Sequence, residues 1–395
     1  MTDRTARRRV DALSRMAFRG SVGFVAATYV GYPLTALALS HIAPRPHQTG
    51  DPTGVVTVIV AAHNEGAVLA QKLRSVLDGD LDGVEVEVIV VDDGSTDDTA
   101  AAASSIGSVR VLRLPRCGKA AALAAAVEVA SGGVLVFTDA NSLFERGTLA
   151  AVLRPFADPA VGGVVGDQRY RGDSGSAGER AHWAFDRMLK AAESAIGSTV
   201  SATGALYAIR RTHVSTIPEG VTDDFYISTG AVLGGGRLVF APEAVVTEWA
   251  AATPRDEYAR KVRVMTRGLR AVWLRRPLLS PRHGFYSASL LSRKVFRRLT
   301  APAILVSAAA SLAAPRRSVP SLAVAAGSVS FVSLAAVGWY GPERLGKNPI
   351  VSLPTFACLS VAATMHALWN TATGVRVTRW ESAGAPRDAL DESTP

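Results

Sequence analysis

The feature that most limits how this chain can fold is an apolar run that ends on acids. Val88 to Val91 are followed directly by Asp92 and Asp93, and then by Gly, Ser and Thr. A run rich in β-branched residues is typical of a strand buried on both faces of a parallel sheet. A second run, Val134 to Thr138, ends on Asp139. Because ligands bind past the carboxyl ends of strands in open α/β sheets, we expect both ends to line one crevice for a nucleotide and a metal.

Residues 52–275 continue this alternation of strand and helix patterns. The alternation predicts an α/β domain with a doubly wound, mostly parallel sheet. We expect strands at Val55–Ala62, Val86–Val91, Val109–Leu114 and Val134–Thr138, and helices at Glu65–Asp78, Thr96–Ser104 and Lys119–Ala130. Asn64 is expected to cap the first of these helices. Residues 160–250 are less regular, and we expect them to complete the sheet and to form the acceptor side.

Composition and charge favour a membrane over nucleic acid as a partner. The 395 residues are 48% hydrophobic, with a mean hydropathy of +0.19 and a net charge of +9. Such a charge alone suggests nucleic acid or an anionic membrane surface. The basic residues lie beside apolar segments and form no groove with interleaved aromatic residues, so we expect membrane lipids and no nucleic acid. Cys117 and Cys358 lie in unlike contexts, which fits a reducing cytosolic face without a disulfide framework.

Apolar segments at both ends predict membrane helices. Residues 1–17 form a basic segment and residues 18–45 an anchor, because residues 21–42 are nearly uncharged and long enough for a bilayer core of about 30 Å. A signal peptide is the competing interpretation, but no clear small-residue cleavage site follows. Three more apolar segments are expected within residues 299–372, at 299–314, 319–340 and 350–370, before a polar tail at 373–395. The first of them is short enough to be re-entrant or interfacial.

A basic stretch indicates how these helices are oriented. Residues 275–298 hold seven Lys or Arg and no Asp or Glu, so residues 276–298 are expected to form basic juxtamembrane or interfacial helices. Such clusters lie on the cytoplasmic side, where a nucleotide-dependent site also finds its substrate. We therefore expect a multi-pass protein of the cell membrane with a cytoplasmic catalytic domain. The basic N-terminus favours the same side, which one intervening span cannot satisfy, so its orientation stays open.

Several polar residues are placed for nucleotide and metal binding. Glu65 and Asp93 follow the ends of the first and second predicted strands. Asp139 and Asn141 offer two oxygen-bearing side chains at positions i and i+2, and oxygen is the ligand that Mg²⁺ and Mn²⁺ prefer. Lys119 could bring an ammonium group near phosphate. The aspartates and Asn141 could equally form ordinary turns.

Two further groups are candidates for acid–base chemistry and for anion binding. Asp223 and Asp224 are adjacent, and paired carboxylates raise each other's affinity for protons, which suits a general base. An exposed helix N-cap is the alternative. Arg260 and Arg263 share one face of a helix expected at residues 258–273. They could bind a diphosphate or lie on anionic lipid headgroups.

A series of short motifs occurs in the order and spacing seen in family 2 glycosyltransferases, which have the GT-A fold. The motifs are Ala61-Ala62-His63-Asn64-Glu65, Val90-Val91-Asp92-Asp93-Gly94-Ser95, Gly118-Lys119-Ala120-Ala121, Phe137-Thr138-Asp139-Ala140-Asn141, Thr203-Gly204-Ala205 and Thr222-Asp223-Asp224. The resemblance covers roughly residues 55–300. The flanking apolar segments resemble the membrane-embedded branch of that family, which includes polysaccharide synthases.

The resemblance implies a role for each matching position. The nucleotide crevice would hold Glu65, Asp93, Lys119 and Asp139. Asp139 would also bind the diphosphate through Mg²⁺ or Mn²⁺, together with Asn141 in the place of the usual second acid. Asp224 would be the general base, beside Asp223 in the place of a Glu. The acceptor and diphosphate side would include Gly204, Arg260 and Arg263.

The chain also departs from the family pattern. Ala124 stands where an Asn is usual, and the Gln-x-x-Arg-Trp motif of processive synthases falls on residues 260–264. Arg263 is retained there, but the Gln and the Trp are not. Because that Trp commonly helps to hold the acceptor, its absence puts the synthesis of long chains in doubt, though not the transfer of a sugar.

Together these features predict a membrane-bound, inverting glycosyltransferase. It would move a sugar from a nucleotide-diphosphate donor, expected to be a UDP-sugar, to a glycan hydroxyl in cell-envelope polysaccharide synthesis. The first alternative is the transfer of one sugar to a polyprenyl phosphate or another lipid. The second is a catalytically silent membrane scaffold, which Ala124 and Asn141 motivate and which Asp93, Asp139 and Asp224 argue against.

Overall fold

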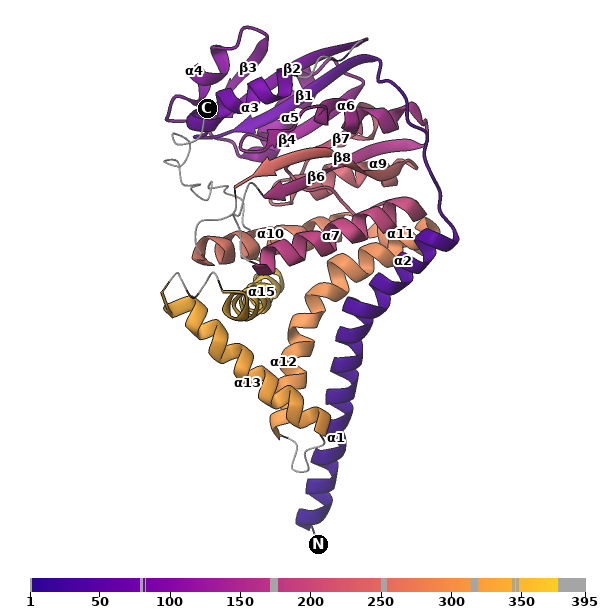
Figure 1. Cartoon of the computed structure of the whole chain (residues 1–395), viewed down its shortest axis with the longest axis vertical. Helices are drawn as coiled ribbons and strands as arrows, with labels where there is room; N and C mark the ends of the chain where they lie inside the picture. The colour runs from indigo at the N-terminus through magenta and orange to yellow at the C-terminus, as the bar shows by residue number, and fades with distance from the viewer. Residues whose placement is uncertain are drawn as a thin grey trace.

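The computed structural model describes residues 2–78, 81, 83–170, 177–249, 254–313, 319–342, 345 and 348–375. An α/β domain lies at one end and a group of long helices at the other (Figure 1). Helices α7 (Ala177–Ile196) and α10 (Pro254–Leu274) run between the two parts. Both helices therefore connect the sheet with the long helices.

The α/β domain is built on a mixed sheet. Within the described residues it has eight strands in the order β3-β2-β1-β4-β7-β6-β8-β5. Their bounds are β1 Gly54–Ala62, β2 Val84–Asp93, β3 Val109–Leu114, β4 Val134–Asp139, β5 Leu143–Phe144, β6 Val161–Tyr170, β7 Tyr207–Arg210 and β8 Arg237–Glu248. The first four strands are parallel, as predicted, whereas β7 runs antiparallel to both β4 and β6. The carboxyl ends of β1, β2 and β4 therefore meet at one edge.

Both faces of this sheet are buried, which explains the unbroken apolar runs in the sequence. On β1, Ile59 joins the core on one face, while Val58 and Val60 join the core on the other. The other helices of the domain are α3 Gly66–Leu77, α4 Thr99–Ser104, α5 Lys119–Val129, α6 Thr148–Leu153, α8 Asp223–Ser228 and α9 Gly230–Leu233. The predicted helices exist, with ends shifted by up to four residues, and residues 96–98 form a turn before α4.

The predicted N-cap at Asn64 is wrong. Helix α3 begins at Gly66, and Asn64 lies in the left-handed region with φ of 55°. Its Oδ1 accepts a hydrogen bond from the backbone N–H of Thr96 at 2.8 Å, and its own N–H donates to Ser95 Oγ at 3.0 Å. Asn tolerates this conformation because its short side chain bonds locally. Asn64 thus joins the loops that follow β1 and β2, the two that line the expected crevice.

The long helices are more continuous than the apolar segments suggest. Helices α1 (Thr2–Ala26) and α2 (Tyr32–Ile42) join through the π-helical turn η1 (Ala27–Gly31), and α11 (Phe285–Leu290) joins α12 (Arg297–Ala313) through a second π-helical turn, η6 (Leu291–Phe296). With α13 (Val319–Tyr340) and α15 (Pro349–Ala372), the described residues contain four helical stretches long and apolar enough to cross a membrane. The expected boundary after residue 298 falls inside the 28-residue stretch Phe285–Leu312. The basic residues of η6 therefore belong to that helical stretch.

The start of the chain lies far from the α/β domain. Helix α1 begins at the end of the molecule opposite to the sheet and packs along α12 (Figure 1). The basic N-terminus and the basic stretch near residue 293 are thus at different ends of these helices. With this arrangement only one of the two basic segments can lie on the cytoplasmic side.

Two neighbouring glycines before β4 give a matched test of this packing. A Cβ on Gly132 would lie 2.5 Å from the backbone N of Thr57, whereas a Cβ on Gly133 would meet no atom within 4 Å. We expect Gly132→Ala to destabilise the domain by roughly 1–3 kcal/mol, as overpacking does, and Gly133→Ala to change stability by less than about 0.5 kcal/mol. Thermal unfolding of the detergent-purified protein, followed by tryptophan fluorescence, measures both. Equal midpoints for the two variants would contradict the packing of β4 on β1.

Candidate active site

An ammonium group joins two of the predicted acids at the carboxyl edge of the sheet. Lys119, the first residue of α5, donates a hydrogen bond from Nζ to Asp139 Oδ1 at 2.7 Å, and Nζ lies 3.0 Å from Asp223 Oδ2. Asp139 ends β4 and Asp223 begins α8. Burial alone would lower the pKa of Lys119, but the two carboxylates raise it above its ordinary value. Residues from three separate elements thus form one charged cluster, which includes three of the predicted site residues.

Asp93 holds the loop that presents Lys119. Its Oδ1 accepts hydrogen bonds from the backbone N–H groups of Cys117 at 2.7 Å and Gly118 at 3.0 Å, and the side chain is almost fully buried. Gly118 has φ of 88°, a conformation that favours glycine. The contact of Asp93 with a nucleotide stays a prediction. In the structure, Asp93 also has a structural role, because these hydrogen bonds fix the start of α5.

Glu65 lies on the neighbouring loop, at the N-terminal end of α3. Its backbone N–H donates to Thr99 Oγ1 at 2.8 Å, which joins this loop to the start of α4. Glu65 is therefore at the same sheet edge as Asp93, as the sequence predicts. Its part in nucleotide binding stays a prediction.

The surroundings of Asp139 fit a divalent cation that is shared with a diphosphate. The side chain of Asp139 is 33% exposed, and Asn141 lies two residues further along the same turn. A Cβ on Gly204 would lie 2.8 Å from Asp139 Oδ2, so only a glycine leaves this oxygen free to take a ligand. The described residues hold no group of three or more His, Cys, Asp or Glu that could enclose a metal by themselves. Mg²⁺ and related cations are commonly bound by one or two carboxylates together with substrate phosphates, and this donor set suits that mode.

The environment of Asp224 suits a general base. Burial, and secondly the charge of Asp223, raise the pKa of Asp224 to about 6, while the positive charges of Lys294 and Lys119 oppose that rise. Asp224 Oδ1 accepts a hydrogen bond from the backbone N–H of Phe225 at 2.7 Å. A base works best when its pKa is close to the working pH, and a pKa near 6 meets that condition.

The arginines of α10 have different partners. Arg260 makes a two-pronged ion pair with Glu257, at 2.7 and 2.9 Å, so its guanidinium is engaged within its own helix. Arg263 lies one turn further along α10. Arg267, which the sequence analysis did not select, interacts electrostatically with Asp223, and this charge opposes the lowering of its pKa by burial. Its place on the same helix face as Arg263 was the signal that could have identified it.

Two hydroxyl groups near the acids were also missed. Tyr207 Oη and Thr203 Oγ1 are buried and have no hydrogen-bond partner among the described residues. The Tyr207 ring stacks on Phe137, with centroids 5.0 Å apart. Burial, with the charges of Asp223, Asp224 and Asp139, holds the pKa of Tyr207 well above its ordinary value, so it stays a neutral donor. Buried polar groups are normally hydrogen-bonded, so these two hydroxyls are exceptions close to the acids.

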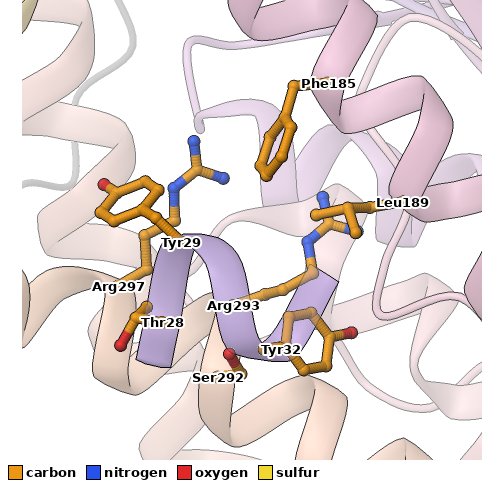
Figure 2. A pocket seen from close by; sticks show the side chains of 8 residues that line it. All are labelled: Thr28, Tyr29, Tyr32, Phe185, Leu189, Ser292, Arg293 and Arg297. Atoms are coloured by element: carbon orange, nitrogen blue, oxygen red, sulfur yellow. The ribbon is translucent and has the colours of Figure 1, made fainter. Parts of the chain in front are cut away.

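A buried ion-pair network attaches the α/β domain to the long helices. Arg293 of η6 pairs with Glu193 at 2.8 Å and with Asp186, both on α7, and the Tyr32 hydroxyl donates to Glu193. Arg297 Nη2 lies 3.0 Å from Nδ1 of His182 on the same helix. Figure 2 shows how Arg293 and Arg297 enclose a small pocket together with side chains of η1, α2 and α7. This network fixes the position of η6 relative to the sheet.

The opposite face of η6 points toward the acids. Lys294 Nζ lies 5.4 Å from the ring centroid of Phe225, the residue after Asp224. Arg298 packs on α10, where a Cβ on Gly268 would lie 2.7 Å from its Nη2. Arg298 Nε is buried without a hydrogen-bond partner in the described part of the chain. Of these two residues, Lys294 lies beside Phe225, and its positive charge acts on Asp224.

Three relatives resemble parts of the chain in sequence or in structure. An N-acetylglucosaminyltransferase of Rhizobium meliloti is 25% identical over 67% of each chain, and a poly-beta-1,6-N-acetyl-D-glucosamine synthase of Staphylococcus aureus is 24% identical over 48% of each. A solved mannosyltransferase from Pyrobaculum calidifontis, in complex with GDP-Man and Mn²⁺, covers 91% of this chain and is itself covered in full. It superposes with a TM-score of 0.68 at 25% identity.

The chain spans 38% to 67% of the lengths of the curated relatives that it matches. The family model for glycosyl transferase family 2 matches residues 57–217, which contain strands β2 to β7 and all but the first three residues of β1. The predicted GT-A-type α/β class is confirmed by the superposition with the mannosyltransferase. Residues 57–217 thus match the model of glycosyl transferase family 2, and the chain has a GT-A glycosyltransferase fold flanked by long apolar helices.

Proposed function

We propose that this chain transfers a sugar from a nucleotide-diphosphate donor to a hydroxyl acceptor at a membrane, with inversion at the anomeric carbon. The observation that carries the proposal is the cluster in which Lys119 joins Asp139 and Asp223 beside Asp224. It offers a carboxylate for a cation, an ammonium for phosphate, and a base with a raised pKa. Direct transfer needs these three and no covalent intermediate.

The mechanism follows from the charge of these groups. Asp139 and Asn141 would hold Mg²⁺ or Mn²⁺, and the bound cation supplies charge neutralisation to the leaving diphosphate. Lys119 and Arg267 add positive charge on the same side. Asp224 takes the proton from the acceptor hydroxyl, and the sugar is attacked from the face opposite to the diphosphate. Positioning and electrostatic stabilisation supply most of the acceleration.

The donor is proposed to be a UDP-sugar bound between the loops of Glu65, Asp93 and Lys119. The two curated relatives with glycosyltransferase names act with N-acetylglucosamine by those names, which supports a UDP-linked amino sugar. The solved mannosyltransferase holds GDP-Man. The donor test must therefore include both nucleotides.

The acceptor is proposed to be a glycan hydroxyl in the synthesis of an envelope polysaccharide, which the synthase relative supports. A lipid phosphate acceptor is the second candidate, and the cationic face of Lys294 and Arg298 favours it. Both cations lie on the helical stretch Phe285–Leu312, which is long and apolar enough to cross a membrane. Gly204 and Arg263 would then face the diphosphate side. Counting the sugars added per acceptor distinguishes the two candidates.

The proposed location is the cell membrane, with several spans and the catalytic domain in the cytoplasm. Four long apolar helical stretches among the described residues support the spans. The basic residues of η6 lie at the domain end of these helices, which supports a cytoplasmic domain by the positive-inside rule.

The first prediction concerns the donor and the cation. Purified protein is expected to release nucleoside diphosphate from one member of a panel of UDP- and GDP-sugars when Mg²⁺ or Mn²⁺ is present, and EDTA is expected to abolish the release. The cation is needed because the diphosphate gains a further negative charge as it leaves, while Lys119 is already paired with two carboxylates. Binding of UDP without release from any donor or acceptor would favour the scaffold interpretation instead.

A second prediction concerns the base. Asp224→Asn is expected to lower kcat by about 10²–10⁴-fold, the usual contribution of general base catalysis, with little change in nucleotide binding. Nucleotide affinity by calorimetry and release by a coupled assay measure the two effects. Glu128→Gln, an exposed charge change on α5, is the control and should keep wild-type activity. Activity of Asp224→Asn close to that of the control would exclude the assigned role.

A third prediction uses the pKa of Asp224, which is about 6. The base must be ionised, so kcat/KM is expected to rise with pH up to about 6 and then to level off. Asp223→Asn removes a neighbouring negative charge, so the rise in kcat/KM should occur at lower pH. Lys294→Gln removes a positive charge and should move it to higher pH. Steady-state pH profiles test both directions, and a common shift in the two variants would refute the electrostatic assignment.

A further inference from the structure

A lysine lies where the pattern of α3 calls for an apolar residue. Leu69, Leu73 and Val76 form the buried stripe of this helix, and Lys72 falls on that stripe, with a relative exposure of 0%. A buried ammonium group is costly unless it is hydrogen-bonded and its charge is compensated. The mechanism proposed above makes no use of Lys72, so its position requires a separate explanation.

The ammonium of Lys72 is aimed at the loop that carries the cation site. Its Nζ donates to Thr138 Oγ1 at 2.8 Å and to the carbonyl oxygen of Ser142, and it lies 3.8 Å from the ring centroid of Phe144. Thr138 and Ser142 lie on the two sides of the Asp139–Asn141 turn. Lys72 therefore binds both ends of the segment that would hold the cation.

Glu248 also binds the Asp139–Asn141 turn, through Ser142. The hydroxyl of the fully buried Ser142 donates to Glu248 Oε1, and Gln168 Nε2 donates to Glu248 Oε2 at 2.6 Å. The backbone N–H of Ser142 closes the turn on the carbonyl of Asp139 at 3.2 Å. We call Lys72, Ser142 and Glu248 the Ser142 clamp. It joins α3, the turn after β4, and the end of β8.

Asp139 also interacts electrostatically with Lys72 and Glu248. Lys72 makes no ion pair within 4.0 Å among the described residues, yet the negative charges of Asp139 and Glu248 oppose the lowering of its pKa by burial. Burial, and then the charge of Asp139, raise the pKa of Glu248. The pKa of Lys72 nevertheless stays well below its ordinary value, so it is the contacts of Nζ with Thr138 and Ser142 that hold the turn.

The orientation of the Asp139–Asn141 turn is important because the turn offers a cation one carboxylate and one amide, rather than two carboxylates. A weak ligand set depends on the orientation of each ligand, and outer contacts that orient metal ligands commonly change metal affinity by 10–100-fold. We propose that Lys72 and Glu248 are positioning residues that hold the Asp139–Asn141 turn in the geometry that binds a divalent cation with the donor diphosphate. The proposal rests on the proposed function, because it assumes a cation at Asp139.

The test measures cation binding apart from turnover. Mn²⁺ is titrated into the full-length protein in detergent with saturating UDP, and in parallel with GDP, and free Mn²⁺ is followed by its electron paramagnetic resonance signal. Lys72→Met keeps the length and the apolar stem but removes the ammonium. Its Mn²⁺ affinity is expected to fall by about tenfold or more. The apparent KM for Mn²⁺ should rise by the same factor, with kcat at saturating Mn²⁺ falling less than threefold.

Lys190→Met is the matched control. Lys190 is also a buried lysine, but it pairs with Asp186 on α7 at 3.1 Å, in the network that attaches the long helices. This variant should lower the thermal midpoint and leave Mn²⁺ affinity within twofold of wild type. A loss of Mn²⁺ affinity in both lysine variants would show a general effect of removing a buried charge and would overturn the proposal.

A second variant keeps the test decisive if Lys72→Met does not fold. Glu248→Met removes the acceptor of the Ser142 hydroxyl at similar length, and it should also weaken Mn²⁺ binding by about tenfold. Wild-type Mn²⁺ affinity in a folded clamp variant would refute the inference. Absence of Mn²⁺ and nucleotide binding by the wild-type protein would instead refute the proposed function, so the two failures are distinguishable.

Discussion

The candidate site depends on one interaction, in which the ammonium of Lys119 lies between the carboxylates of Asp139 and Asp223. Three carboxylates from β4 and α8 lie close together at one sheet edge, and like charges at short distance repel one another. The ammonium of Lys119 compensates two of them, and Asp93 holds the loop that precedes Lys119. The same charge is then available to a diphosphate, so one side chain connects the stability of the free site with the binding of its substrate.

A second constraint comes from the membrane side. Arg293 binds Asp186 and Glu193 on α7, and this fixes η6 against the α/β domain. Arg293 and Lys294 point to different sides of the same helix. The ion pairs that hold Arg293 on α7 therefore orient Lys294 toward Phe225 and the acids. Removing one partner of such a buried pair would leave an uncompensated charge, at a cost of about 3–5 kcal/mol. The surroundings of Asp224 are thus formed jointly by the domain and the long helices.

Much of the domain was predictable because its signals are local. Val134–Thr138 is an unbroken apolar run, and such runs identify strands buried on both faces whatever their neighbours are. The acids at the ends of β2 and β4 were predicted to meet because parallel strands bring their carboxyl ends to one edge. The antiparallel β7, the left-handed Asn64 and the join of α11 to α12 were not predicted. Each depends on a partner distant in sequence, with Thr96 as the partner of Asn64.

By itself, the sequence determined the parallel half of the sheet, the family resemblance, and the acids Asp93, Asp139 and Asp224, because hydrophobic periodicity and short motifs are encoded in neighbouring residues. Only the tertiary structure decided what those acids contact. Contacts between segments far apart in the chain decide this. They are the ion pairs of Lys119, the contacts of Arg293 with α7 and of Lys294 with Phe225, and the hydrogen bonds of Lys72 to the Asp139–Asn141 turn. Electrostatic energies depend on distance and burial in space, and neither quantity is written in the order of the residues.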